Sequence, residues 1–162
     1  MQLQLSHDPI EDRLLLRLDL DGQCYGFWLT RRVTILLWPV LWSMLEHGVI
    51  PGAGTEARRW LLAMDHEKAR SGQEVQQAPP ISLIAPVRLV VTIQHGHQAD
   101  GRHVLGLFDG SGAGETMTLD DDGLHALIRL LHETVPKAGW DIPLSLPQSG
   151  LTPASVGTSL RH

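Results

Sequence analysis

The sequence predicts an α+β fold of two small antiparallel units, each a β-hairpin or three strands followed by a helix, with one additional helix between them. Alternating apolar and polar residues within 13–29 and 88–119 predict the strands. A polar capping residue and apolar residues at helical spacing follow each stretch. The chain has 162 residues, 43% of them apolar and 19% charged, which is typical of a globular protein with its own core.

A short strand at residues 1–5 and a hairpin open the first unit. Residues 13–20 and 23–29 alternate, and Asp21-Gly22 between them favours a type I′ turn, in which both central residues have a positive φ angle. A two-residue turn pairs apolar side chains across the hairpin, namely Leu14 with Leu29, Leu16 with Phe27, and Leu18 with Tyr25.

The helix of the first unit is predicted over residues 31–47, with Thr30 as its N-cap. It carries ten large apolar side chains and almost no polar face, so most of its surface must be buried. Pro39 lies within it and is expected to kink it, because proline lacks a backbone donor. Trp38 and Trp42 share one face, and we expect one of them to lie at the interface of a homodimer unless the second unit covers that face.

The remaining elements follow in the same way. Thr55 is expected to cap the additional helix at residues 56–70, which completes the unit at 1–72. Residues 73–87 are rich in glutamine and proline and predict a linker. The strands of the second unit, 88–140, are expected at 88–97, 102–108 and 115–119, and its helix reaches about residue 135 with Asp120 as its cap.

Two further expectations concern the second unit and the end of the chain. Leu89, Val91 and Ile93 are expected to share the strand face that covers the first unit. Residues 141–162 are rich in proline, serine and glycine and predict a flexible tail.

The two units share a plan. Aligning residues 28–30 with 118–120 sets Leu37 beside Leu127 and Leu41 beside Leu131. The identity between the units is too low to distinguish an internal duplication from a coincidence, so both interpretations stay open.

Composition limits the classes of function. The longest apolar run, residues 33–45, is shorter than the roughly 20 residues that span a bilayer, so no membrane partner is expected. Residues 1–10 lack the basic and apolar regions of a signal peptide, and the single Cys24 allows no internal disulfide, which favours a cytoplasmic protein. The net charge of −5 disfavours nucleic-acid binding, because such binding needs a basic surface.

Four stretches of the sequence carry a resemblance. They are EDRLLLR at 11–17, FWLTRR at 27–32, LWP at 37–39 and KAGW at 137–140. In these stretches the chain resembles a group of small uncharacterised bacterial proteins, and the similarity covers most of its length. The resemblance implies a bacterial cytoplasmic protein and assigns no functional residue.

Two pairs of arginines are candidate contacts for an anion or a protein partner. Arg31 and Arg32 stand at a helix start, where the helix dipole disfavours positive charge. With the free backbone amides they can bind a phosphate or a partner's carboxylate. Arg58 and Arg59 repeat the pattern, and all four can form one patch. The alternative is that the first pair is solvated or paired with an acidic residue: Glu11, Asp12 or Asp19.

Three histidines in the second unit are candidate metal ligands. If residues 99–101 form a three-residue loop, His97 lies opposite His103, and His95 shares that face. Three imidazoles on one face suit zinc with an open position. A two-residue loop instead sends His103 to the other face, and the spacing matches no established motif, which favours an ordinary polar hairpin.

No combination of residues predicts catalysis. The glycines at 109–115 lack the spacing of a dinucleotide fingerprint, and Cys24 has no identified base beside it. We therefore expect no cofactor and favour a non-catalytic role over an enzyme.

The favoured function is a protein-binding or assembly module, of the adaptor kind, that acts through protein–protein contacts as a homodimer. The alternative is a metal-binding protein or a metal-dependent hydrolase that uses His95, His97 and His103. Nucleic-acid binding through the four arginines is a third possibility, which the acidic net charge disfavours.

Overall fold

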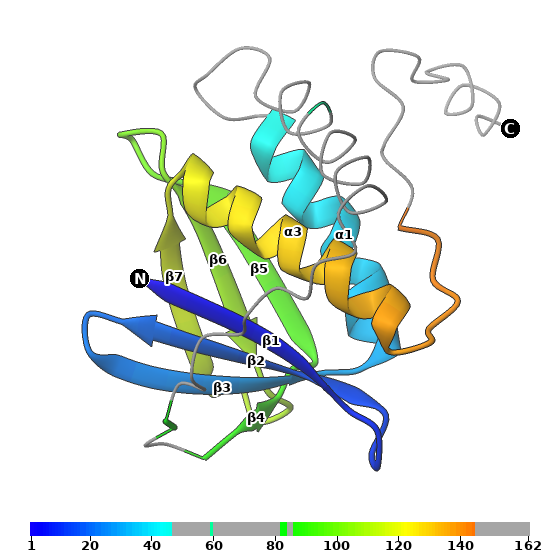
Figure 1. Ribbon diagram of the computed structural model, residues 1–162. Coiled ribbons are helices and arrows are strands. Elements are labelled where there is room, and N and C mark those ends of the chain that lie inside the picture. Colours follow the sequence, from blue (N-terminus) through cyan, green and yellow to red (C-terminus); the bar gives the residue numbers. More distant parts are fainter. Residues whose placement is uncertain (47–58, 60–81, 84–85, 145–162) are drawn as a thin grey trace, which may run out of the picture.

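A computed structural model describes residues 1–46, 59, 82–83 and 86–144 of the chain. The described part contains two β-sheets and two helices, so the predicted α+β class is confirmed (Figure 1). The predicted helix at 56–70, except Arg59, and most of the predicted linker lie outside the described residues.

The first sheet has the strand order β1-β2-β3-β4. Its strands are β1 (Gln2–Asp8), β2 (Arg13–Leu20), β3 (Gln23–Leu29) and β4 (Arg88–Leu89). The first three form an antiparallel meander, and β4 pairs with β3 in the parallel direction.

The β2–β3 hairpin has the register that the sequence predicts. Asp21 and Gly22 have φ angles of 53° and 82°, as a type I′ turn requires. The turn pairs Leu14 with Leu29, Leu16 with Phe27, and Leu18 with Tyr25. All the leucines of these pairs and Phe27 are buried. The register is therefore fixed by turn geometry and by burial of a single face.

The second sheet has the order β5-β6-β7, with β5 at Thr92–His97, β6 at His103–Phe108 and β7 at Gly114–Leu119. The strand predicted at 88–97 is divided between the two sheets. The amide of Val90 donates to the carbonyl of Trp28 in the first sheet, and that of Val91 donates to Phe108 in the second. This change of sheet buries Val90, while Leu89 is exposed. The predicted inward face of Leu89, Val91 and Ile93 is therefore wrong, because Leu89 and Val91 are exposed.

The helices begin where the capping residues predict. α1 (Arg31–Glu46) follows Thr30, whose hydroxyl accepts from the amide of Val33, and it continues past Pro39. α3 (Asp121–Lys137) follows Asp120, whose carboxylate accepts from the amide of Gly123. No helix of the described part is long and apolar enough to cross a membrane.

One core joins the two sheets. Figure 1 shows α1 and α3 in contact on the same side of both sheets, and the buried side chains of both units form a single apolar cluster. Within this cluster Trp38 is 5% exposed and Trp42 is 1% exposed. The indole of Trp38 stacks on His132 of α3, with 6.3 Å between ring centroids. The proposed interface role of these tryptophans is therefore wrong, because the second unit covers them within one chain.

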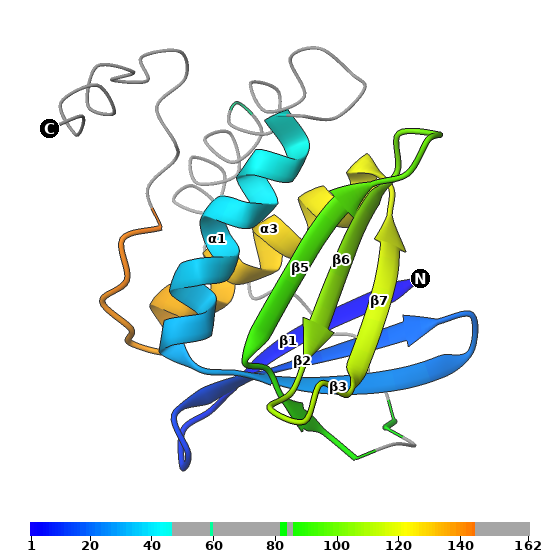
Figure 2. The ribbon, with the colours of Figure 1, turned by 180° about the vertical axis from the view of Figure 1, so that it is seen from behind.

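The opposite sheet faces are partly open. Seen from behind, the second sheet faces the viewer with no described helix over it (Figure 2). On the first sheet, Leu83 and Val87 from the predicted linker pack against Gly26, where an added Cβ would lie 2.8 Å from Leu83. Near the end of the described chain, Ile142 and Leu144 from the predicted tail pack against the core. Residues 145–162 lie outside the described part.

The units also match in buried positions. Each is an antiparallel three-stranded meander that ends in a leucine, followed by a capping residue and a helix. The aligned leucines, Leu37 with Leu127 and Leu41 with Leu131, are all buried. The two units therefore share the plan that the sequence predicts, and the corresponding faces of their helices are buried.

Candidate partner-binding surface

The start of α1 is tied to the β1–β2 turn by an ion pair. Arg31 donates from Nε and Nη2 to the carboxylate of Asp12, at 3.1 and 2.6 Å. Arg31 is therefore paired rather than free to bind an anion. The structure has the pairing with Asp12 that the sequence analysis gave as one alternative.

Asp12 connects three distant segments. Besides Arg31 it accepts from the indole Nε1 of Trp140 at 2.7 Å and from Nε2 of His7 at 3.0 Å. Trp140 is buried, and Arg31 lies over its ring at 5.3 Å. The backbone of Asp12 has a φ angle of 54°, a left-handed conformation that aspartate adopts more readily than most side chains.

These contacts make the Asp12 carboxyl more acidic by lowering its pKa. The hydrogen bond from Trp140 and then those from His7 and Arg31 favour the charged form, and they lower the pKa of Asp12 from 3.8 to about 2. The Asp12 carboxylate thus connects β1, α1 and the segment after α3 through hydrogen bonds and has a structural role. Its ion pair with Arg31 orients the start of α1.

The outward face of α1 carries apolar side chains. Arg32, Ile35, Leu36, Pro39 and Glu46 are exposed and recur at helical spacing along one face of α1, which we call the α1 face. Ile35 and Leu36 are 51% and 53% exposed. Arg32 is exposed and has no ion-pair partner in the described part of the chain. Two large aliphatic side chains beside an arginine are the kind of surface that protein partners cover.

The predicted arginine patch is only partly described. Arg59 is exposed, whereas Arg58 lies outside the described residues. Of the four arginines, Arg31 is paired and Arg32 belongs to the α1 face. The patch as a unit stays a prediction.

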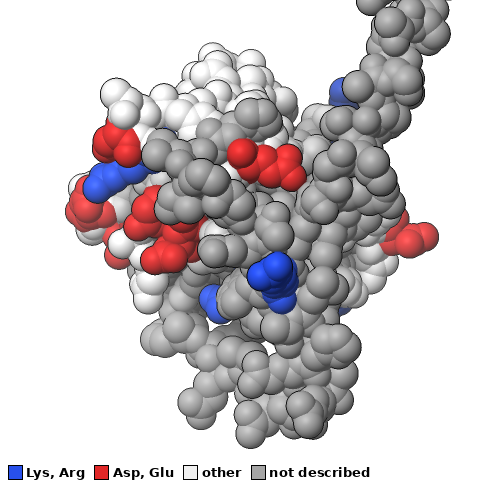
Figure 3. All heavy atoms as spheres, turned by 90° about the horizontal axis from the view of Figure 1, so that it is seen from above, with Lys and Arg blue, Asp and Glu red and all other residues white. Residues whose placement is uncertain are grey.

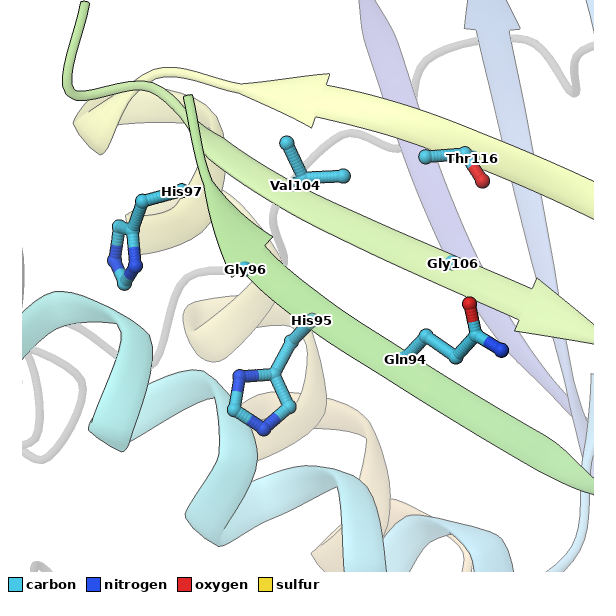
Figure 4. A pocket seen from close by; sticks show the side chains of 7 residues that line it. All are labelled: Gln94, His95, Gly96, His97, Val104, Gly106 and Thr116. Atoms are coloured by element: carbon cyan, nitrogen blue, oxygen red, sulfur yellow. The ribbon is translucent and has the colours of Figure 1, made fainter. Parts of the chain in front are cut away.

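The three histidines of the β5–β6 hairpin lie as the three-residue loop predicts. The amide of Gln98 donates to the carbonyl of Arg102, Gly101 has a φ angle of 86°, and His97 pairs with His103 across the strands. Figure 4 shows the side chains of His95 and His97 leaving β5 on the same side. Among the described residues, no group of three or more His, Cys, Asp or Glu is arranged to hold a metal ion.

The other face of this hairpin is hollowed. Gln94, Gly106 and Thr116 lie side by side across β5, β6 and β7, and they line a hollow of about 240 Å³ (Figure 4). An added Cβ at Gly96 would meet nothing within 4 Å, so the missing side chain there leaves space in the hollow, whereas at Gly106 it would lie 2.6 Å from the ring of Phe108. The lining also includes His95 and His97 and contains no carboxylate or cysteine, so the hollow offers imidazole, hydroxyl and amide groups rather than a thiol or a carboxylic acid.

Charge is unevenly spread over the described surface. Seen from above, acidic side chains gather on the side where Figure 1 places the β5–β6 turn and the start of α3 (Figure 3). Those elements carry Asp100 and the consecutive aspartates at residues 120–122. The acidic side favours basic or neutral partners over nucleic acid.

Sequence reasoning missed Trp140 and His7 as partners of Asp12. Trp140 is 128 positions away from Asp12, and no local pattern indicates that contact.

Comparison with known proteins identifies no relative: no family model, no curated protein and no solved structure matches the chain.

Proposed function

We propose that this chain is a non-catalytic protein-binding or assembly module of the cytoplasm, which makes its contacts through the α1 face and pairs first with a second copy of itself. The observation that supports this proposal is the exposure of Ile35 and Leu36, at 51% and 53%, next to Arg32. Apolar side chains with arginine at their edge are enriched where proteins bind each other.

The placement of exposed side chains along α1 suits a twofold pairing. Arg32 and Glu46 stand near opposite ends of the α1 face, about 21 Å apart along a regular helix. In an antiparallel pair of α1 helices centred on Pro39, the Ile35–Leu36 pairs of the two copies flank Pro39, about 10 Å apart along the helix axis, and Arg32 and Glu46 of each copy lie at the two ends of the interface. Twofold dimers are the commonest soluble oligomers, and their interfaces are self-complementary in this way.

Sedimentation velocity at micromolar concentration tests the proposal. The unmodified chain is expected to sediment as a dimer, and a double variant, Ile35→Glu with Leu36→Glu, as a folded monomer, because the change would bury carboxylates in the interface. Ile10→Glu is the matched control, since Ile10 is 92% exposed in the β1–β2 turn and is not part of the α1 face. A monomeric unmodified chain would refute the homodimer, and a dimeric double variant would refute the α1 face as its interface.

A further inference from the structure

Two histidines meet beneath α1 and α3. His97 of β5 and His103 of β6 are directly opposite each other, and their ring centroids are 5.1 Å apart at an interplanar angle of 66°. His103 is 1% exposed, whereas His97 lies at the exposed edge of the sheet. A buried imidazole therefore contacts one that solvent reaches.

Each ring is held through the same nitrogen. Nε2 of His103 lies 2.6 Å from Oδ1 of Asp121, and Nε2 of His97 lies 3.2 Å from the carbonyl oxygen of Met44. A carbonyl oxygen and a carboxylate only accept hydrogen bonds, so both histidines donate from Nε2. A neutral ring that donates from Nε2 carries its lone pair on Nδ1.

The remaining nitrogen of His103 has no hydrogen-bond partner among the residues that the structure describes. Its Nδ1 atom is buried and accepts or donates no hydrogen bond. Buried polar atoms are nearly always satisfied, so this nitrogen is open to a water molecule, a ligand or an ion. Within the described part of the chain, Nδ1 of His97 has no hydrogen-bond partner either.

This is the arrangement in which proteins present histidine to a metal. Metal-bound histidines donate their other N–H to a carboxylate or a carbonyl, which fixes the tautomer and the ring orientation. Two imidazoles on one tetrahedral zinc, with Zn–N bonds of about 2.0 Å, place their ring centroids about 5 Å apart. The observed 5.1 Å separation agrees with that geometry.

We propose that Nδ1 of His97 and Nδ1 of His103 bind a borderline divalent cation such as Zn²⁺, with Asp121 and the Met44 carbonyl as their supporting acceptors. No third ligand stands ready among the described residues, so water or a group from a binding partner completes the coordination. A site with two protein ligands binds metal reversibly, unlike a resident cofactor. The proposal is independent of the α1 face.

The test uses untagged full-length protein, Zn²⁺ as the probe and ¹⁵N-labelled histidine, so that NMR resolves each ring. The metal-free protein is expected to show the Nε2–H tautomer at His97 and His103, and zinc is expected to shift Nδ1 of both in one saturable transition. The ring-resolved signals separate this site from binding at the other seven of the chain's nine histidines. An Nδ1–H tautomer at either ring, or zinc that leaves both Nδ1 signals unmoved, would overturn the proposal.

Calorimetric zinc titration of variants gives a second decision. His97→Gln should weaken binding by at least tenfold, and Asp121→Asn by about 10–100-fold, as for other supporting carboxylates. His95→Gln is the matched control, because His95 lies two residues away on the same strand face and should leave the affinity unchanged. Equal effects of His95→Gln and His97→Gln would place the metal elsewhere and refute the site.

Discussion

Replacing Leu41 by alanine tests whether the two units share one core. Leu41 has no exposed surface and belongs to the apolar cluster that α1 and α3 form with both sheets. The change removes three carbon atoms, worth about 2.4 kcal/mol at roughly 0.8 kcal/mol for each buried methylene. The cavity that remains adds to this, so the free energy of unfolding should fall by about 2–5 kcal/mol.

Urea unfolding followed by NMR signals from both sheets measures this loss. Since one cluster contains residues of both units, signals from β1–β3 and from β5–β7 should be lost at the same urea concentration. Ile10→Ala is the control outside the core and outside the α1 face, because Ile10 is 92% exposed and its truncation should change stability by no more than about 0.5 kcal/mol. Separate midpoints for the two sheets, or a loss below about 1 kcal/mol for Leu41→Ala, would refute the shared core.

Two other predictions concern pH and turn geometry. The pKa of Asp12 is lowered from 3.8 to about 2, so its stabilising contribution is present above pH 3.8 and is lost as the pH falls toward 2. Urea unfolding at several pH values should therefore show a weaker acid dependence in Asp12→Asn than in the unmodified chain, and an unchanged dependence would contradict the role of Asp12. Gly22→Ala should cost about 1–2 kcal/mol, because the φ angle at Gly22 is 82°. Gly110→Ala, where φ is not in the left-handed range and nothing lies near the added carbon, should be neutral or slightly stabilising, and equal effects of the two changes in thermal unfolding would refute the explanation.

The sequence predicted the local parts of the fold well. The β2–β3 register follows from a two-residue turn and one apolar face, and both are written within residues 13–29. The caps at Thr30 and Asp120 are local for the same reason, since a hydroxyl or carboxylate reaches an amide three residues on. The position of His97 opposite His103 likewise depends on the length of one short loop.

The errors arose where distant segments meet. The strand predicted at 88–97 alternates without a break, and nothing local shows that Val90 pairs with one sheet and Val91 with the other. Trp38 looked available for a second copy because its cover, His132 of α3, is far along the chain. The apolar content of α1 indicated a buried helix, but only the packing shows that Ile35 and Leu36 are the side chains left outside.

The contact between Asp12 and Trp140 has a consequence for folding rates. It joins positions 128 residues apart, so forming it early would require closing almost the whole chain into a loop at a large entropic cost. The hairpins and helices can form from neighbouring residues before that closure. The contact is therefore expected to be absent from the folding transition state, and weakening it should speed unfolding while leaving the folding rate nearly unchanged. The contacts of Asp12 would then slow the unfolding of the folded chain and leave its folding rate nearly unchanged.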